Sequence, residues 1–353
     1  MHHHLSAFVA GAMGLSPTAV RVSPCRPLDH QSNRLYDVRA GGRHLILKEY
    51  LKPDEFREAS AREYGALELL APLGIAPRPV LMQPEPMPPL GPVVVYEFMD
   101  GEMWDRHRPT AAGLAALADV WLRMHAVSQE NLWMSRGYER SFAEIGVHWH
   151  ARLQAYVAWV DAEFPKGRGA AELCLAALER CHAVARELAD HSPLLCFCRG
   201  DSRFANVIAR PDGRLGLVDW EDSGLRDPAR DVADLLTHAN QEDLLSTDEW
   251  QAFLQPYLTV RGTIDPQLRH RLHLYLALFP VFWLVLLIDH GMRLANAGQL
   301  ANWSINALPA NQRLRRYLAR ALAWPEVNFT DQLAALQGLD FFPTRASSWQ
   351  HDR

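Results

Sequence analysis

The sequence contains few cysteines and has no excess of basic residues. Its 353 residues include five cysteines, too few for the disulfide scaffold of a small secreted protein. The 36 Lys and Arg residues are outnumbered by 41 Asp and Glu residues, which gives a formal net charge of −5. Because a nucleic-acid-binding protein usually carries a basic excess, we expect no nucleic-acid partner. The composition, 48% apolar and 22% charged, also excludes a disordered or collagen-like protein.

Long apolar runs are scarce as well. The N-terminus lacks a basic segment followed by a long apolar run, so no signal peptide is expected. The segment Leu272–Ile288 is apolar apart from His273, but it is at the short limit for a membrane span and contains Pro280. A buried helix explains it better than a membrane segment, and the predicted location is the cytoplasm. Residues 2–4 are histidines, which fit either a tag remnant or a native segment.

The residue pattern changes part of the way along the chain. Residues 1–20 are weakly patterned and form a predicted N-terminal arm. In residues 21–98, short apolar runs bounded by turn residues predict strands around one helix. In residues 99–340, amphipathic periodicity predicts mainly helices, and residues 341–353 form a tail. The predicted fold is therefore of the α+β class, with a small antiparallel-sheet lobe followed by a larger, mainly helical lobe.

One stretch combines a turn signal with polar residues at strand ends. Pro211-Asp212-Gly213 predicts a tight turn, and the apolar runs on both sides of it predict a β-hairpin over residues 207–218. Asn206 precedes the first strand and Asp219 follows the second, so the hairpin brings these two side chains together. Asp201 lies five residues before Asn206, in the loop that leads into the hairpin.

This arrangement fits phosphoryl transfer. Carboxylate and amide oxygens are hard ligands suited to Mg²⁺, and a separate carboxylate accepts the proton of the substrate hydroxyl in kinase reactions. The spacing from Asp201 to Asn206 matches the catalytic loop of protein kinases. Asp201, Asn206 and Asp219 would each, taken alone, be more simply explained as turn or strand-end residues. Their combination around one hairpin favours a site for ATP and Mg²⁺.

The same stretch resembles the aminoglycoside phosphotransferase/choline kinase family. The resemblance rests on Gly200-Asp201, Asn206, the run Val218–Gly224, and Asp227-Pro228 with Asp231. It covers residues 196–236 closely and residues 25–330 more loosely. It implies a bilobal protein-kinase-like fold and ATP-dependent transfer of the γ-phosphate to a hydroxyl of a small molecule. It also implies that Asp201 is the catalytic base and that Asn206 and Asp219 bind Mg²⁺.

The resemblance extends to a nucleotide site in the first lobe. Lys48 resembles the lysine that contacts the α- and β-phosphates of ATP, with Glu63 as its helix partner. The sequence supports this pair independently, because Glu63 falls four residues after Ala59 and four before Leu67, within an apolar helical stripe. A carboxylate buried in such a stripe needs a cationic partner to offset its desolvation.

Two further segments belong to the expected nucleotide site. Glu97-Phe98-Met99 resembles the hinge, where the backbone groups of Glu97 and Met99 would meet adenine. Ser32 and Asn33 lie where the phosphate-covering loop belongs. The glycines that are usual in that loop are absent from this chain, which is one departure from the family pattern.

For four residues near the catalytic loop, the sequence indicates a structural role or leaves the role open between two alternatives. The family usually has a histidine two residues before the catalytic Asp, whereas this chain has Arg199, which can donate to the same carbonyls but is bulkier and always charged. Asp227 before Pro228 is most simply a helix N-cap. Asp231, one turn later, braces the catalytic loop in the family. Glu221 fits a third metal-site carboxylate or a solvated loop residue equally well.

The cysteines and histidines favour packing over chemistry. Cys174 and Cys181 share a predicted helix stripe, and Cys196 and Cys198 share one face of a predicted strand. No histidine is spaced in the sequence to complete a zinc site. His125 lies next to the apolar stripe of its helix and is expected to be a packed core residue.

The sequence leaves the acceptor open. Residues 241–353, where the acceptor pocket is expected, contain ten Asp and Glu, ten Arg and no Lys, so the acidic excess that suits a polycationic antibiotic is missing. A sugar, an amino alcohol and an aminoglycoside-like compound all stay candidates. The alternative function is a nucleotide-binding pseudokinase with a regulatory role, which the glycine-poor loop and Arg199 favour. The intact Asp201, Asn206 and Asp219 oppose that alternative.

Overall fold

The chain divides into two compact units. The structure is a computed structural model that describes residues 2–25, 33–51, 59–88, 90–104, 108–127, 142–241, 244–300, 303–305, 308–323 and 329–343. Unit 1 comprises Met1–Tyr138, Leu194–Asp231 and Leu244–Ile264, and unit 2 comprises Glu139–Pro193, Val232–Asp243 and Asp265–Arg353. All of the predicted site residues belong to unit 1. The units group discontinuous segments and do not test the predicted lobe boundaries, which stay a prediction.

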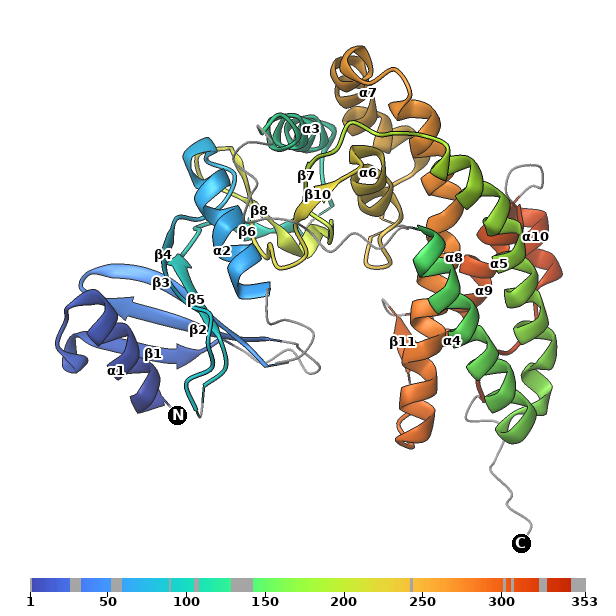
Figure 1. Ribbon diagram of the computed structural model, residues 1–353, viewed down its shortest axis with the longest axis horizontal. Coiled ribbons are helices and arrows are strands. Elements are labelled where there is room, and N and C mark those ends of the chain that lie inside the picture. The colour runs from blue at the N-terminus through green and yellow to red at the C-terminus, as the bar shows by residue number, and fades with distance from the viewer. Residues whose placement is uncertain are drawn as a thin grey trace, which may run out of the picture. The chain divides into compact units, whose positions relative to one another are not determined.

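A five-stranded antiparallel sheet begins unit 1 (Figure 1). Its strands are β1 (Val20–Pro24), β2 (Asn33–Ala40), β3 (Arg43–Tyr50), β4 (Pro79–Gln83) and β5 (Val93–Glu97), in the order β1-β2-β3-β5-β4. Gly41 and Gly42 join β2 to β3 with positive φ angles of 56° and 78°. A two-residue hairpin turn of this kind needs positive φ at both positions, which glycine adopts without strain. Alternate residues of β2 and β3 are buried, as Val38, Leu45 and Leu47 show.

Helix α1 (His2–Met13) packs beside β1, as Figure 1 shows. Leu5 and Val9 are fully buried in a cluster with Val20, Val38 and Leu47 of the sheet. A 3-10 turn, η1 (Pro17–Ala19), connects the helix to β1. The predicted N-terminal arm thus contains a helix that belongs to the core of unit 1.

Helix α2 (Ala59–Leu70) contacts β4 and β5. Its buried residues include Ala59, Glu63, Ala66, Leu67 and Leu70. The helix is followed by η2 (Ala71–Leu73), which ends at Gly74 in the left-handed conformation (φ 70°). The apolar stripe of α2 carries Glu63 into the interior.

The rest of unit 1 supplies short strands and two helices. Strands β6 (Glu102–Met103), β8 (Val207–Ala209) and β9 (Leu215–Leu217) form one sheet, and β7 (Cys196–Cys198) pairs with β10 (Gly224–Arg226). Helices α3 (Ala111–His125) and α7 (Thr247–Ile264) pack together, and the 3-10 turn η6 (Phe204–Asn206) precedes β8. The pairing of Val207 with Leu217 confirms the predicted hairpin.

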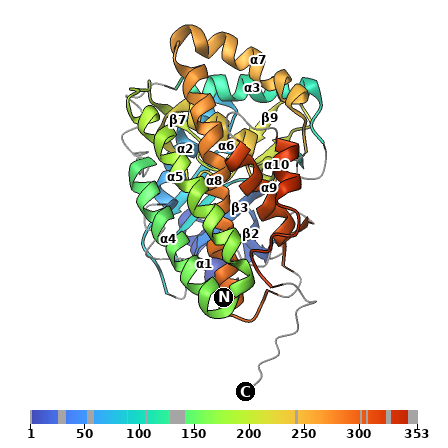
Figure 2. The same cartoon turned by 90° about the vertical axis from the view of Figure 1, so that its right-hand side faces the viewer.

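Unit 2 is mainly helical (Figure 2). It contains α4 (Phe142–Glu163), η5 (Pro165–Gly167), α5 (Arg168–Ala189), α8 (Leu268–Asn296), β11 (Ser304–Ile305), β12 (Leu308–Pro309), α9 (Ala310–Ala323) and α10 (Phe329–Ala335). Helix α8 contacts α4, α5 and α9, and these helices lie side by side in Figure 2. Helix α6 (Pro228–Thr237) begins in unit 1 and ends in unit 2.

Helix α8 contains the long apolar run of the sequence. By length and composition it could cross a membrane, with a mean hydropathy of 2.0 in its most apolar window, and 67% of that window is buried. A core helix of a soluble protein passes the same test, and the contacts with α4, α5 and α9 provide such a core. Pro280 is itself buried within the helix.

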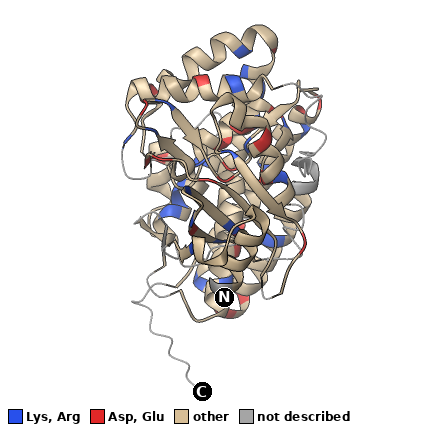
Figure 3. Cartoon of the chain, turned by 90° about the vertical axis from the view of Figure 1, so that its left-hand side faces the viewer, with Lys and Arg blue, Asp and Glu red and all other residues tan. Residues whose placement is uncertain are grey.

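The described architecture confirms the predicted fold class, because an antiparallel sheet lies in the N-terminal region and helices dominate the C-terminal part. Figure 3 shows acidic and basic residues interspersed over the strands and helices that face the viewer. This mixture agrees with the near balance of charge in the sequence.

Candidate active site

The hairpin brings Asn206 and Asp219 together. The Val218 N–H donates to the Asn206 carbonyl at 3.1 Å, and Asn206 Nδ2 donates to Asp219 Oδ2 at 3.3 Å. The Asp219 backbone has a φ of 69°, and Asp219 is the one non-glycine residue with positive φ among the described residues. Such a conformation costs about 1–3 kcal/mol, and it persists only where the surrounding structure holds it in place. The hairpin therefore fixes the Asp219 carboxylate next to the Asn206 amide.

Asp201 lies close to the same point. Arg203 joins the two carboxylates, because its Nε is 3.0 Å from Asp201 Oδ2 and its Nη2 is 3.1 Å from Asp219 Oδ2. The Asp201 and Asp219 side chains remain 24% and 21% exposed, so both can meet a molecule from solution. The sequence interpretation did not single out Arg203, although its position two residues after Asp201 was the available signal.

Gly200 permits the tight path of the catalytic loop. It has a φ of +87°, and a Cβ at this position would lie 2.0 Å from Arg226 Nη1 and 2.2 Å from the Asp222 carbonyl oxygen. Only glycine combines this backbone conformation with so close an approach. The Gly200 N–H donates to Asp231 Oδ1 at 3.0 Å, which confirms that Asp231 braces the loop.

Arg199 ties the catalytic loop to the end of the hairpin. It is buried, and its Nε donates to the Asp201 carbonyl at 2.7 Å. Its Nη2 donates to the carbonyls of Val218 and Asp219, the latter at 3.2 Å. The guanidinium also stacks 4.8 Å above the Trp220 ring. Arg199 therefore provides the loop contacts expected at this position, and it does so with several donors.

Lys48 lies among three carboxylates. Its Nζ is 2.6 Å from Glu63 Oε2, 2.5 Å from Asp219 Oδ1 and 3.0 Å from Glu221 Oε2. Burial alone would lower the pKa of Lys48, but the carboxylates of Asp219 and Glu63 raise it well above its ordinary value. Burial likewise opposes ionisation of Asp219, yet Lys48 and Arg203 hold the pKa of Asp219 below its usual range. Lys48 is therefore a fixed positive charge at the centre of the site.

The Lys48–Glu63 contact joins strand β3 to helix α2 within the site. Glu63 is completely buried on α2, and it accepts a second hydrogen bond from the Tyr50 hydroxyl on β3. Burial raises the pKa of Glu63, and Lys48 opposes that shift. The requirement for a cation beside this carboxylate, inferred from the helical stripe, matches the observed contact.

The carboxylates of Glu63, Asp219 and Glu221 form a group whose oxygens lie within 4.8 Å of one another. Asn206 lies beside Asp219, and half a turn of the Asn206 amide brings its oxygen, another hard ligand atom, next to the Asp219 carboxylate. The donor set therefore fits a hard divalent cation such as Mg²⁺. Glu221 is only 14% exposed and contacts Lys48, so it is not a solvated loop residue.

Four candidate residues of the nucleotide site remain, namely Ser32, Asn33, Glu97 and Met99. Asn33 Nδ2 donates to Glu221 Oε2 at 2.6 Å, and Ser32 lies outside the described residues. The Glu97 N–H already donates to the Arg78 carbonyl at 2.8 Å. The Met99 sulfur lies so close to Gly216 that a Cβ there would be 2.0 Å away. The adenine-binding role of Glu97 and Met99 stays a prediction.

The Asp227-Pro228 pair begins α6 as predicted. The Ala229 N–H donates to Asp227 Oδ1 at 2.9 Å, which is an N-cap hydrogen bond, and Pro228 is the first residue of the helix. The cap fixes the first turn of α6, and that turn carries Asp231. The hydrogen bond between the Gly200 N–H and Asp231 therefore depends on a helix N-cap that the sequence predicts.

Comparison with known proteins identifies the same region. A sequence model described as the phosphotransferase enzyme family matches residues 24–275, which is more than half of the chain. This match includes every predicted site residue. A search of curated protein sequences finds no match.

Solved structures share the fold at low sequence identity. A choline kinase from Cryptosporidium parvum Iowa II has a TM-score of 0.63 at 14% identity, with 95% of this chain and 99% of that chain covered. The choline kinase LicA from Streptococcus pneumoniae has a TM-score of 0.57 at 18% identity, with 91% and 100% covered. A spectinomycin phosphotransferase, APH(9)-Ia, solved with ADP and spectinomycin, has a TM-score of 0.54 at 14% identity, with 89% and 92% covered.

Proposed function

The chain belongs to the phosphotransferase enzyme family, and from that membership we propose that it transfers the γ-phosphate of ATP to a hydroxyl of a small molecule. The observation that carries this proposal is the meeting of Asp201, Asn206, Asp219 and Lys48 in one site. The ADP in the spectinomycin phosphotransferase supports an adenine nucleotide as the donor.

Asp201 acts as the catalytic base. Its carboxylate is partly exposed and is held by Arg203, so it can accept a hydrogen bond from an incoming hydroxyl. As the oxygen of that hydroxyl attacks the γ-phosphorus, Asp201 takes up the proton. Two hydrogen bonds hold the backbone next to the Asp201 side chain in place. Arg199 donates to the Asp201 carbonyl, and the Gly200 N–H donates to Asp231. The loop is thereby aligned before the substrate arrives.

The phosphates lie against Lys48 and the end of the hairpin. Asn206 and Asp219 would hold Mg²⁺, which when bound neutralises charge on the phosphates. Lys48 keeps its contact with Glu63 and exchanges its contacts with Asp219 and Glu221 for contacts with phosphate oxygens. Arg203 stands between Asp201 and Asp219, where its guanidinium stabilises charge that develops on the transferred group.

The acceptor is a small hydroxyl compound such as a sugar, an amino alcohol or an aminoglycoside-like molecule. The structural neighbours include choline kinases and a spectinomycin phosphotransferase, which supports this class without selecting within it. The charge balance of residues 241–353 disfavours a polycation, so neutral and singly charged acceptors come first. A cytoplasmic location would supply ATP and stays part of the proposal.

The test is an assay of ATP turnover with Mg²⁺ and a panel of sugars, choline-like amino alcohols and aminoglycosides, with the phosphorylated product identified. We expect one acceptor to stimulate ADP release, and Asp201→Asn to lower kcat by about 10²–10⁴-fold, the usual contribution of a general base. Asp212→Asn is the matched control, because Asp212 lies in the exposed hairpin turn and bonds Arg214. That variant should turn over at the wild-type rate.

Two results would overturn the proposal. One is an Asp201→Asn variant that turns over as fast as wild type with the stimulating acceptor. The other is nucleotide binding without phosphoryl transfer to any acceptor in the panel, the behaviour of a regulatory pseudokinase.

A further inference from the structure

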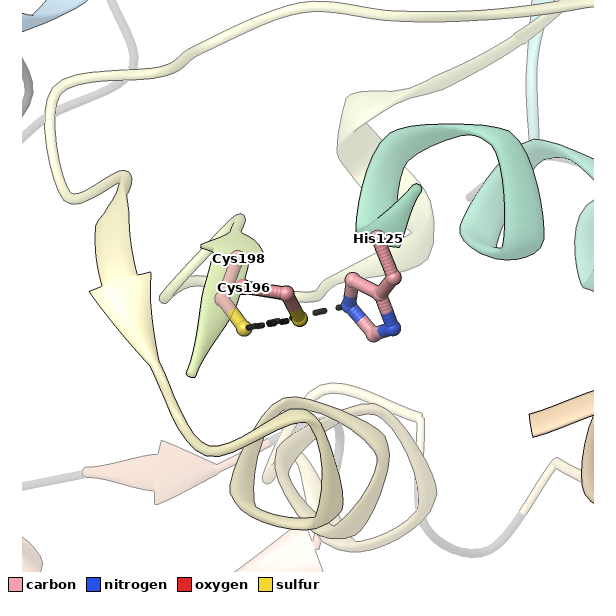
Figure 4. A group of neighbouring side chains, drawn as sticks. All are labelled: His125, Cys196 and Cys198. Carbon is pink, nitrogen blue, oxygen red and sulfur yellow. Dashed lines mark hydrogen bonds between the residues drawn. The ribbon is translucent and has the colours of Figure 1, made fainter. Parts of the chain in front are cut away.

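Two cysteines and one histidine meet in the interior of unit 1, away from the site described above. Cys196 and Cys198 lie on β7, and His125 is the last residue of α3. Figure 4 shows both sulfur atoms and the imidazole pointing toward one another. All three residues are buried, and their candidate ligand atoms lie within 4.8 Å of one another. Sequence spacing predicted only packing roles for these residues, because His125 is distant along the chain from both cysteines.

The distances match those between ligands of a tetrahedral zinc ion. The two sulfur atoms are 3.7 Å apart, and Cys198 Sγ is 3.8 Å from His125 Nε2. With Zn–S bonds of about 2.3 Å and Zn–N bonds of about 2.0 Å, tetrahedral geometry places two sulfurs about 3.8 Å apart and a sulfur and a nitrogen about 3.5 Å apart. The side chains therefore already stand at ligand spacing.

The surroundings of the imidazole also suit metal binding. His125 Nδ1 is 2.8 Å from the Tyr257 hydroxyl, a contact in which the ring N–H can donate to the phenol oxygen. Metal-binding histidines commonly donate their second ring N–H in this way, which fixes the ring and leaves the other nitrogen for the metal. His125 Nε2, the nitrogen left for a metal in that tautomer, faces both Cys198 and Asp231.

Asp231 lies beside the imidazole but outside the group of three. Its Oδ2 is 3.2 Å from His125 Nε2, whereas the group whose candidate ligand atoms all lie within 4.8 Å of one another comprises His125, Cys196 and Cys198. Its Oδ1 accepts the Gly200 N–H. The Cys198 sulfur is also 3.5 Å from the Arg226 carbonyl, a contact through its thiol proton that metal binding would remove.

We propose that His125, Cys196 and Cys198 bind one zinc ion in the interior of unit 1. On binding, the two thiols lose their protons to solvent, both sulfurs bond zinc, and no group is oxidised or reduced. The site rests on this cluster alone, so it stands whether or not the phosphotransfer proposal holds.

The first test is the zinc content of the purified full-length chain after equilibration with zinc and removal of loosely held metal. Because residues 2–4 are histidines, the measurement uses a background in which these three are replaced by alanine. We expect about one zinc per chain, a content close to zero in Cys196→Ala/Cys198→Ala, and an unchanged content in Cys174→Ala/Cys181→Ala. The second pair is the matched control, because Cys174 and Cys181 are also buried but lie on α5 in unit 2.

The second test does not depend on whether a cysteine variant folds. Cobalt added to the metal-free chain with the three histidines replaced should produce thiolate-to-cobalt charge-transfer absorption and the intense visible bands of tetrahedral cobalt, and zinc should abolish both. A zinc content near zero in the folded parent chain would overturn the proposal. So would an equal zinc content in the Cys196→Ala/Cys198→Ala variant, or a cobalt spectrum without thiolate bands.

Discussion

Unit 1 contains two buried polar clusters of contrasting chemistry. The charged cluster consists of Lys48, Glu63, Asp219 and Glu221, and the thiol–imidazole cluster consists of His125, Cys196 and Cys198. The charged cluster pairs one ammonium with three carboxylates and opens to solvent at Asp219. The thiol–imidazole cluster combines two thiols with one imidazole, and all three side chains are buried. The cluster around Lys48 is therefore suited to exchanging ligands with solvent, and the thiol–imidazole cluster is suited to retaining a bound ion.

The two clusters are linked through the loop between them. Asp231 contacts His125 with one oxygen and the Gly200 N–H with the other. Burial opposes its ionisation, but the His125 hydrogen bond and the Gly200 N–H hold the pKa of Asp231 below its usual range. Burial alone would lower the pKa of His125, but Cys198 and Asp231 raise it, and the result is a pKa of about 9. Asp231 therefore links the thiol–imidazole cluster to the loop at Gly200.

The largest expected effect comes from removing the positive charge at the centre of the charged cluster. Lys48→Met leaves Glu63, Asp219 and Glu221 close together without their cation. We expect a loss of about 3–5 kcal/mol in unfolding free energy in urea, as for a broken buried ion pair. The deficit should shrink at lower pH, because the unpaired carboxylates can then take up protons. A variant as stable as wild type at pH 8 would show that these contacts contribute little to the fold.

Arg199 tests the junction between the clusters with a smaller effect. Arg199→Ala removes the donor shared by the carbonyls of Asp201, Val218 and Asp219. We expect a total loss of about 1–3 kcal/mol, the cost of an unsatisfied buried polar group. Arg199→His should be milder, because an imidazole N–H can still donate to one of these carbonyls. Urea unfolding and kcat should both rank the proteins as wild type, then histidine, then alanine. Equal losses in the two variants would contradict the hydrogen-bonding role.

Glu249 provides the smallest effect and an exposed reference for both clusters. It closes a capping box at the start of α7, where it accepts from the Ser246 N–H at 2.8 Å, and it pairs with Arg108 at 2.6 Å. These contacts lower the pKa of Glu249 to about 2, with Arg108 as the largest cause. Since the folded pKa is depressed, the stabilisation is present above the ordinary value of about 4.3 and is lost as pH falls toward 2.

The corresponding measurement compares Tm for wild type and Glu249→Gln from pH 7 down to pH 3. Wild type should melt slightly higher at pH 7, and the difference should narrow below about pH 4.3, where an unperturbed glutamate begins to protonate. A difference that stays constant over this range would show that the charge of Glu249 does not contribute.

The sequence predicted those parts of the site that depend on local pattern. The turn at residues 211–213 and its flanking strands predicted that Asn206 and Asp219 would meet, and the structure brings them together. The helical stripe predicted that Glu63 would be buried beside a cation, because the cost of burying a carboxylate can be inferred without coordinates. In each case a short-range rule fixes which side chains face each other.

Contacts between distant segments could not be inferred in this way. His125 approaches Cys198 only because α3 and β7 pack together, and no spacing in the sequence encodes that arrangement. Arg203 was overlooked because an arginine two residues from a carboxylate is common on protein surfaces. Glu221 could not be assigned between metal site and solvent until its contact with Lys48 was visible.

The left-handed backbone of Asp219 affects how its side chain should be tested. Alanine is disfavoured there by about 1–2 kcal/mol relative to glycine, so Asp219→Ala would mix a conformational penalty with the loss of the carboxylate. Asparagine tolerates the same backbone and keeps the side-chain volume. Glycine relaxes the turn while deleting the ligand atoms. The pair Asp219→Asn and Asp219→Gly therefore separates what the oxygen atoms do for chemistry from what the strained residue costs the folded chain.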